Sequence, residues 1–490
     1  MNRNKAVRNR WGRRLMVVAL IVSLMFGMVG CFGRIGDWFT RPSLDSEYEA
    51  GIAEVFHRIL EEHYSEPTAE QLYEGALRGM FASLEDPYSR FMNAEEFAQY
   101  QADREETFVG IGVRVQNIEE SVFVIDVYDN SPAERAGIIP GDVITHVDGE
   151  DYRGRMFNAV VQAVLGDEGT EVEIGVQRAG AASTFFMTMV REEIDTPSAT
   201  FETLDVDDQR IGVLNVLSFG PTTHQTVDQK IQTFEQGSHD GLIIDMRNNP
   251  GGSLNTLVRM LDLFLSSDAS SPFFTIDVRD ATQPDGWDTN VFHGTSGGER
   301  DYPIVILVNG FSASASEVFA AVMHEYGGHD VVGTTTFGNG TSQFIRQMAA
   351  IDGAATQITS GIWYTTDGNL VEGVGYEPSV FIEQNPYFDF LSLYIPEGKT
   401  FAHDVVADEV KTAQMILNAL GYDVREDGYF DQDTETALKA FQGELFISKS
   451  GILDSETAAY LNNAAREFRQ DRANDSQFSE ALRRILNEDS

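Results

Sequence analysis

IVILVNGFSASASEVFAAVM, residues 304–323, joins an apolar run to a helical run through a turn of small residues. Ile304 to Val308 has the length and β-branched content of a buried strand, and the residues after Glu317 continue as a helix. Such a turn presents a serine hydroxyl at the positive end of a helix, close to backbone N–H groups. Ser314 and Ser316 are therefore candidates for a nucleophile or for a helix cap, and this segment alone favours the cap.

A second strand and turn lie upstream, where residues 241–254 read GLIIDMRNNPGGSL. Gly251 and Gly252 lack Cβ, so their N–H groups can approach a ligand closely. A third segment, residues 331–343, reads VVGTTTFGNGTSQ. The apolar strands at 211–217, 241–247 and 303–308 are suited to burial on both faces. They predict an α/β core over residues 200–385.

These three segments resemble the carboxyl-terminal processing proteases, a family of serine peptidases. Residues 79–90 (GMFASLEDPYSR) and 373–378 (GVGYEP) resemble the same family, and the likeness runs from about residue 46 to about residue 385. It implies a serine endopeptidase with Ser314 as nucleophile. It also implies an oxyanion hole made by the Ala315 N–H and by the N–H of Gly251 or Gly252.

One position departs from the family pattern. The family reads Phe-Gly-Lys-Gly at residues 337–340 and uses the lysine as general base, whereas this chain has Asn339. Asn339 follows Ser314 by 25 residues, the spacing that singles out Ser314 from the neighbouring serines. An amide cannot take a proton from a hydroxyl as an amine can. Gln343 stands where the family's glutamine orients the base, and here it would orient a base or pair with Asn339.

No other residue of the core is an evident base. None of the lysines lies between residues 300 and 385, the six being Lys5, Lys230, Lys399, Lys411, Lys439 and Lys449. His324 falls in the predicted helix and His329 follows two glycines, so we interpret both as structural histidines. Their spacing does not fit the helical zinc motif, and we expect no metal site and no cofactor.

Residues 105–192 form a strand-rich region that resembles a PDZ domain through DNSPAERAGIIPGDVI, residues 129–144. The residues Gly110, Ile111 and Gly112 can turn successive N–H groups inward, and such a nest accepts a peptide's terminal carboxylate. The peptide then adds a strand to the sheet edge. A PDZ fold that no longer binds peptide is the alternative.

The C-terminal part forms a separate small helical module. After a linker at 386–405, apolar residues recur at helical spacing over 408–464. With its Leu-Gly-Tyr, Asp-Gly-Tyr-Phe and Phe-Gln sequences, this region resembles a peptidoglycan-binding domain, and a plain helical bundle is the alternative. Residues 465–490 are a charged, helical tail, and residues 46–104 are a helical N-terminal segment. The fold class is thus multidomain α+β.

The N-terminus indicates where the protein works. Residues 1–14 carry six basic and no acidic side chains, and Leu15 to Gly30 is apolar. This pattern within residues 1–32 is typical of a signal anchor or an export signal. Cys31 resembles a lipoprotein cleavage site, and a cysteine buried in a membrane span is the alternative. Either interpretation tethers the protein to the outer side of the cell membrane.

Composition excludes some partners. The chain has 35 basic and 77 acidic residues, a net charge of −42, which argues against nucleic acid or anionic lipid as partners. A single cysteine allows no disulfide within the chain. The expected partners are unfolded or tail-exposed exported proteins and peptidoglycan, and the sequence leaves an oligomer open.

Two main functions stay open. The first is serine endopeptidase action on exported proteins, with the PDZ domain selecting C-terminal tails. The second is a catalytically impaired pseudoprotease that acts as a PDZ and wall-binding scaffold, which Asn339 favours. A purely structural wall anchor is a third.

Overall fold

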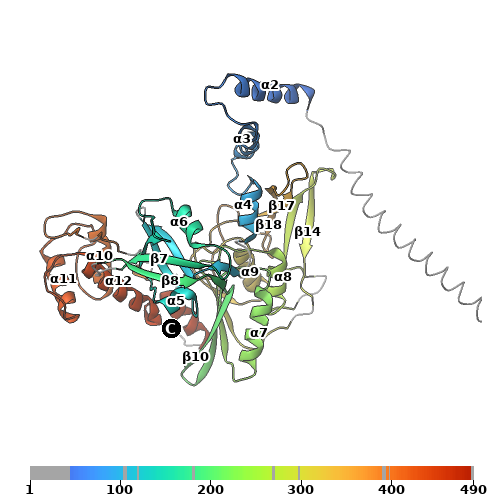
Figure 1. Ribbon diagram of the computed structural model, residues 1–490. Helices are drawn as coiled ribbons and strands as arrows, with labels where there is room; N and C mark the ends of the chain where they lie inside the picture. The colour runs from blue at the N-terminus through green and yellow to red at the C-terminus, as the bar shows by residue number, and fades with distance from the viewer. Residues whose placement is uncertain are drawn as a thin grey trace, which may run out of the picture. The chain divides into compact units, whose positions relative to one another are not determined.

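The computed structural model describes residues 45–102, 107–118, 121–178, 183–266, 271–295, 298–388, 393–396 and 398–486 (Figure 1). The predicted signal segment with Cys31 lies outside these residues. Within the described part, no helix is both long enough and apolar enough to cross a membrane. The described residues divide into two compact units, one before and one after the boundary between Glu85 and Asp86.

The first unit consists of two described helices, α2 (Ser46–Glu62) and α3 (Ala69–Ala82). Helix α3 begins at a capping box. The Gln71 N–H donates to Thr68 Oγ1 at 3.2 Å, and the Thr68 N–H donates to Gln71 Oε1 at 2.9 Å. The prediction of N-terminal helices is confirmed. Helix α4 (Ala94–Ala102), which the sequence pattern joined to this segment, belongs to the second unit.

The strand-rich region contains a six-stranded antiparallel sheet in the order β3-β4-β5-β7-β8, with β6 paired to β5. Its strands and helices are β3 (Val113–Ile118), β4 (Ser121–Val127), α5 (Pro132–Ala136), β5 (Val143–Val147), β6 (Glu150–Asp151), α6 (Phe157–Val164), β7 (Glu171–Gln177) and β8 (Phe185–Val190). A separate pair joins β2 (Thr107–Gly110) to β9 (Glu192–Asp195). Strand β3 is an edge strand, so its outer side is open to a further strand.

The predicted α/β core forms around a second six-stranded sheet, in the order β10-β11-β12-β15-β16-β19. Its strands are β10 (Ala199–Val206), β11 (Gln209–Val216), β12 (Gly241–Asp245), β15 (Ile304–Val308), β16 (Asp330–Gly333) and β19 (Val380–Phe381). All pairs are parallel except the β10–β11 hairpin. Helices α7 (Thr223–Glu235), α8 (Leu254–Leu261) and α9 (Ala315–Glu325) cover one face with an apolar cluster.

A third sheet, which the sequence pattern did not indicate, is antiparallel; four of its strands lie within the predicted core region, and β1 lies in the segment predicted to be helical, residues 46–104. It runs β1-β18-β13-β14 with β17 paired to β18, and its strands are β1 (Arg90–Met92), β13 (Phe274–Arg279), β14 (Trp287–Phe292), β17 (Thr341–Gln347) and β18 (Ala355–Tyr364). Strand β17 starts two residues after Asn339 and contains Gln343, so this sheet carries one side of the candidate site.

The predicted C-terminal module consists of α10 (Asp408–Ala419), α11 (Gln432–Glu444) and α12 (Ser455–Gln470) around its own apolar cluster. The predicted tail is not one appendage. After the short helix η2 (Arg472–Asn474), helix α13 (Ser476–Ile485) packs against the second face of the core sheet. There Phe478, Ala481 and Ile485 are buried with side chains from β11, β12, β15 and β16. Helix α13 therefore completes the protease core.

Candidate active site

Ser314 lies where the sequence predicted, in the turn between β15 and the first residue of α9. Its φ of 55° is in the left-handed region, which is rare for a residue with a side chain. Such strain persists only where the surroundings fix the backbone, and it is common at catalytic positions. The turn therefore holds Ser314, which is half-buried, in a conformation that a simple helix cap does not need.

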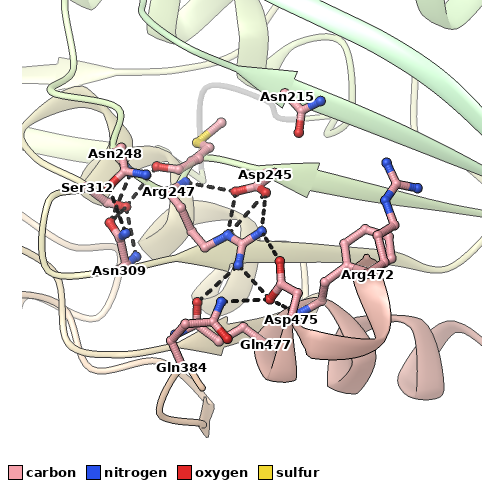
Figure 2. Close-up of polar contacts among 12 residues, drawn as sticks. Asn215, Asp245, Arg247, Asn248, Asn309, Ser312, Gln384, Arg472, Asp475 and Gln477 are labelled. Atoms are coloured by element: carbon pink, nitrogen blue, oxygen red, sulfur yellow. Dashed lines mark hydrogen bonds and ion pairs between the residues drawn. The ribbon is translucent and has the colours of Figure 1, made fainter. Parts of the chain in front are cut away.

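Hydrogen bonds of two successive asparagines, Asn248 and Asn249, fasten this turn to the Pro-Gly-Gly turn after β12. The Asn248 N–H donates to Asn309 Oδ1, and Asn309 Nδ2 donates to Asn248 Oδ1, both at 3.0 Å (Figure 2). The carbonyl of the buried Asn249 accepts from the Ala313 N–H and from Ser316 Oγ, each at 3.0 Å. The two glycine- and serine-rich turns thus form one rigid unit.

Gly251 packs directly against the serine turn. A Cβ on Gly251 would lie 2.9 Å from both Ser314 Cβ and the Ala315 nitrogen, so only glycine fits at its φ of +98°. The Gly251 N–H, however, donates to Asn249 Oδ1 at 2.8 Å. Among the described residues, the N–H groups of Gly252 and Ala315 have no such partner. Of the predicted oxyanion donors, Ala315 and Gly252 are therefore available and Gly251 is not.

Glu317 connects the serine turn to the loop of Asn339. Its side chain is fully buried, and one carboxylate oxygen accepts from the Ser314 N–H at 2.7 Å and from the Asn339 N–H at 2.9 Å. The other accepts from Thr336 Oγ1 at 2.5 Å and from the Gly338 N–H at 2.7 Å. Burial raises the pKa of Glu317, although these four donors oppose the shift. All its acceptor positions are taken, so Glu317 fixes the site and has none left for a proton from Ser314.

Asn339 and Gln343 meet through a third residue. Asn339 Oδ1 accepts from Thr341 Oγ1 at 3.1 Å, and Gln343 Nε2 donates to the same Thr341 hydroxyl at 2.9 Å. In the described chain no hydrogen bond joins the two amides directly, so Gln343 pairs with Thr341 where the sequence suggested Asn339. Because Glu317 binds both backbones, Ser314 and Asn339 are only two hydrogen bonds apart.

The two nearby histidines lie at the far end of α9. His324 is in the last turn of the helix that Ser314 begins, and its Nδ1 bonds the His329 carbonyl at 2.8 Å. Burial lowers the pKa of His329. Ten residues of helix separate Ser314 from His324, which corresponds to about 15 Å. Neither histidine is placed to act as a base for Ser314.

A cavity of about 580 Å³ lies beside the edge strand of the strand-rich region. Strand β3 and helix α6 line it with apolar side chains, among them Val113, Val115, Val160, Val161 and Val164. The Ile111 and Gly112 carbonyls accept from the Ala133 and Tyr128 N–H groups, and Gly112 has a φ of +80°. Within the described residues the Ile111 and Gly112 N–H groups have no partner.

Comparisons with known proteins agree along nearly the whole chain. The model of peptidase family S41 matches residues 210–382, a PDZ domain matches 123–178, and a putative peptidoglycan binding domain matches 406–461. The model of the activating protease CtpB N-terminal domain matches residues 43–96. The carboxy-terminal processing protease CtpB of Bacillus subtilis is 31% identical over 488 residues, covering 97% of this chain and 99% of the relative.

The chain belongs to the carboxy-terminal processing proteases. CtpA of Bacillus subtilis is 30% identical and covers 91% of either chain. Among solved structures, the photosystem II D1 C-terminal processing protease aligns with a TM-score of 0.42 and 23% identity, over 69% of this chain and 94% of that one. Family membership confirms the predicted serine peptidase class and its PDZ and peptidoglycan-binding domains.

The Asp-Pro-Tyr-Ser segment, residues 86–89, lies next to the candidate site, although the sequence did not predict a role for it there. Ser89 Oγ donates to Asp86 at 2.5 Å and accepts from the Thr359 N–H at 2.9 Å. Thr359 pairs with Gln343 across β17 and β18. The pKa of Tyr88 is raised by burial and then by the charges of nearby carboxylates, including Glu317. The sequence signal that could have indicated this placement is the pair of turn-forming residues, Asp86 and Pro87, directly before Tyr88.

The described residues contain no group of three or more His, Cys, Asp or Glu side chains that could hold a metal ion. The candidate site offers a serine hydroxyl, the backbone N–H groups of Ala315 and Gly252, the fully hydrogen-bonded Glu317 carboxylate, and the amides of Asn339 and Gln343.

Proposed function

We propose that this chain is a serine endopeptidase that cleaves exported proteins near their C-termini, with Ser314 as its nucleophile. The observation that carries the proposal is the packing of Gly251 against Ser314 and Ala315. It brings a strained serine, the Ala315 N–H and the turn of Gly252 together at the start of a helix. The comparisons give no support to the alternative of an impaired scaffold.

In this proposal Ser314 Oγ attacks the carbonyl carbon of the scissile peptide bond. The N–H groups of Ala315 and Gly252 donate to the oxygen that becomes negatively charged. Because Asn339 offers only an amide, the hydroxyl proton passes to solvent water, and water protonates the departing amine as the peptide C–N bond breaks. Oxyanion stabilisation and substrate binding still give roughly 10³–10⁴-fold acceleration over water when a member of a catalytic triad is missing. We therefore expect slow cleavage by the natural chain.

The PDZ domain would select the substrate. The apolar cavity between β3 and α6 suits an apolar terminal side chain, and the Ile111 and Gly112 N–H groups suit a terminal carboxylate. The edge position of β3 supports addition of the substrate tail as a further strand. The expected substrates are unfolded or tail-exposed proteins.

The wall would be the place of action. The match to a peptidoglycan-binding domain and the basic, then apolar N-terminus support a protein on the outer side of the cell membrane, held by a membrane span or a lipid. Residues 405–465 alone should sediment with purified peptidoglycan. Because the chain is acidic, binding should improve as salt screens repulsion from wall anions. Absence of sedimentation at every ionic strength would contradict the wall assignment.

Cleavage of an unfolded protein with an apolar C-terminus by purified residues 35–490 tests the catalytic proposal. Asn339→Lys should raise the slow activity by at least about 10²-fold, the lower range for a positioned base. Ser314→Ala added to Asn339→Lys should abolish that gain. Gln347→Lys is the matched control, because it adds the same charge at an exposed position at the end of β17.

Three outcomes would count against the proposal. A gain from Asn339→Lys that survives Ser314→Ala would assign the activity to another group or to a contaminant. Equal gains from Asn339→Lys and Gln347→Lys would show that added charge, and not a base at position 339, raises the rate. A folded Asn339→Lys protein without any cleavage would show that more than the base is missing.

A further inference from the structure

The peptidoglycan-binding module is inserted into the protease core, and its two ends are joined. The chain leaves the core after Ile382 and returns at Asp475. Gln384 Nε2 donates to Asp475 Oδ1 at 2.8 Å, and the Ser476 N–H donates to Gln384 Oε1 at 3.0 Å. Gln477 Nε2 donates to the Ile382 carbonyl at 3.0 Å. Side chains from both segments, residues 382–384 and residues 475–477, therefore fix the point where the chain returns to the core to the point where it leaves.

Asp475 also reaches into the core, where it binds Arg247 (Figure 2). The guanidinium donates to Asp475 Oδ1 at 2.9 Å and to Asp475 Oδ2 at 2.8 Å. Its remaining donors go to both oxygens of Asp245, at 2.7–3.1 Å, and to Gln477 Oε1 at 3.3 Å. An arginine has five N–H donors, and all five are used here.

The pair is closed to solvent, so its bonds are not easily replaced by water. The Arg247 side chain is 13% exposed and the Asp475 side chain 7%. Although burial acts in the opposite direction, Asp245 and Asp475 raise the pKa of Arg247 above its ordinary value. Removing one carboxylate leaves two buried guanidinium donors without an acceptor, which is the costly way to break such a pair.

Arg247 directly precedes the turn that packs against Ser314. Asn248 follows it with a left-handed φ of 62°, and its N–H and side chain bond Asn309 in the serine turn. Ser312 Oγ donates to the Met246 carbonyl at 2.8 Å, on the other side of Arg247. A rotation of the Arg247 backbone would therefore move both sides of the contact between the two turns.

We infer that Asp475, at the return point of the wall-binding module, is a positioning residue for the turn of Gly251 and Gly252, and that it acts through Arg247. Only the kinetic consequence of this inference, a change in kcat, rests on the proposed function. Its structural consequence, the rigidity of residues 246–254, is measurable in the folded protein whether or not it cleaves a substrate.

Asp475→Asn is the sharpest variant, because it removes charge and keeps shape. Asp475 is the N-cap of α13 and accepts from the Phe478 N–H at 3.0 Å. Asparagine caps helices as well as aspartate does, so the helix start should survive. The new NH₂ group then faces the guanidinium, and Arg247 loses one of its two carboxylates.

Asp330→Asn is the matched control. Arg484, at the other end of α13, pairs with Asp330 at 2.9 Å. This ion pair also fastens α13 to the core sheet, but neither residue contacts the turn after β12. A role of Asp475 in merely holding the helix in place predicts similar effects for both variants, whereas a positioning role predicts effects for Asp475→Asn alone.

Hydrogen exchange of the full chain, read in peptides that cover residues 246–254, decides between the two roles. We expect exchange there to be at least about tenfold faster in Asp475→Asn and unchanged in Asp330→Asn. With the natural chain as reference, kcat should fall by about 10–100-fold with KM nearly constant, since misplaced oxyanion donors are felt in the transition state. If Asp475→Asn does not fold, Gln477→Met, which removes the fifth acceptor, should give a smaller acceleration in the same peptides.

Equal exchange in residues 246–254 of all the folded variants would overturn the inference, and so would equal acceleration by Asp475→Asn and Asp330→Asn. The failure of the proposed function looks different. It appears as absent cleavage in the natural chain and in Asn339→Lys, while the exchange data still decide the role of Asp475.

Discussion

Glu317→Gln removes one acceptor oxygen from the centre of the candidate site without changing its shape. The Glu317 carboxylate accepts four donors, and the glutamine amide has one oxygen for two of them. The Thr336 hydroxyl can turn to accept from the new NH₂ group, whereas a backbone N–H cannot. The amide nitrogen should therefore replace the oxygen that binds Thr336 and Gly338. The Gly338 N–H is then left without an acceptor, and so is the Thr336 hydroxyl proton, because the Thr336 oxygen also accepts from the Tyr376 N–H at 2.6 Å.

The magnitude follows from these two donors that lose their acceptor. A buried donor without an acceptor costs about 1–3 kcal/mol. The loss of charge weakens the remaining bonds, but it also removes the cost of burying a carboxylate, the effect that raises the pKa of Glu317. These two changes oppose each other, so we expect the free energy of unfolding to fall by about 2–6 kcal/mol. Glu317→Ala removes the acceptors of all four donors and should lower the free energy of unfolding by at least about 4 kcal/mol.

Urea unfolding of the purified chain measures both losses, with hydrogen exchange at residues 336–340 as a local readout. Glu325→Gln is the control, because Glu325 lies on the same helix and accepts one N–H, that of Asp367, at 2.8 Å on the surface. It should change the free energy of unfolding by less than about 0.5 kcal/mol. A Glu317→Gln protein as stable as the natural chain, or an alanine variant no worse than the glutamine variant, would refute the reasoning.

Three further predictions follow from other parts of the structure. Amidating the C-terminus of an apolar peptide should weaken its binding to the PDZ domain by about 1–3 kcal/mol, because the nest loses its carboxylate; titration calorimetry with acid and amide peptides checks this, and equal affinities would contradict it. Hydrogen bonds and the charge of Arg247 outweigh burial and hold the pKa of Asp475 below 3.8. The ionised Asp475 side chain therefore stabilises the fold fully above pH 3.8, and this stabilisation is lost as pH falls through the lowered pKa. In urea unfolding, the difference in free energy of unfolding between the natural chain and Asp475→Asn should be constant from pH 7 to 5 and should disappear in acid. A chain that ends at residue 464 should be unstable because it lacks α13, whereas replacing residues 386–473 with a short flexible linker should leave the protease core folded; circular dichroism separates the two, and equal stability would argue against the insertion.

The centre of the site could be predicted because short-range patterns carry it. Two apolar strands, each followed by a turn of small residues, place Ser314 and Gly251 at one edge of a parallel sheet. The choice between Gly251 and Gly252 could not be read from the sequence. It depends on the side chain of Asn249, which takes the Gly251 N–H, and a rotamer of that kind is fixed only by the surrounding fold.

The role of the C-terminal helix was out of reach for a different reason. A charged segment after a recognisable module has the pattern of a surface helix, and the three apolar side chains that α13 buries do not say where they are buried. Their partners lie on four strands between residues 211 and 332, so the contact belongs to the topology of the chain. The antiparallel sheet with β17 and β18 was missed similarly, since β1 pairs with β18 across more than 260 residues.

Asn339 is where the local pattern and the surrounding fold disagree. Three successive backbone N–H groups of the loop that carries it are held, since Glu317 accepts the Gly338 and Asn339 N–H groups and Glu372 accepts the Gly340 N–H at 2.7 Å. The side chain at position 339 departs from the family pattern. The carboxylates of Glu317 and Glu372 make this loop an acidic environment. A lysine introduced at position 339 would be stabilised there in its charged form. If Asn339→Lys restores less activity than expected, a raised lysine pKa is the first physical cause to test, and a gain in rate towards alkaline pH would identify it.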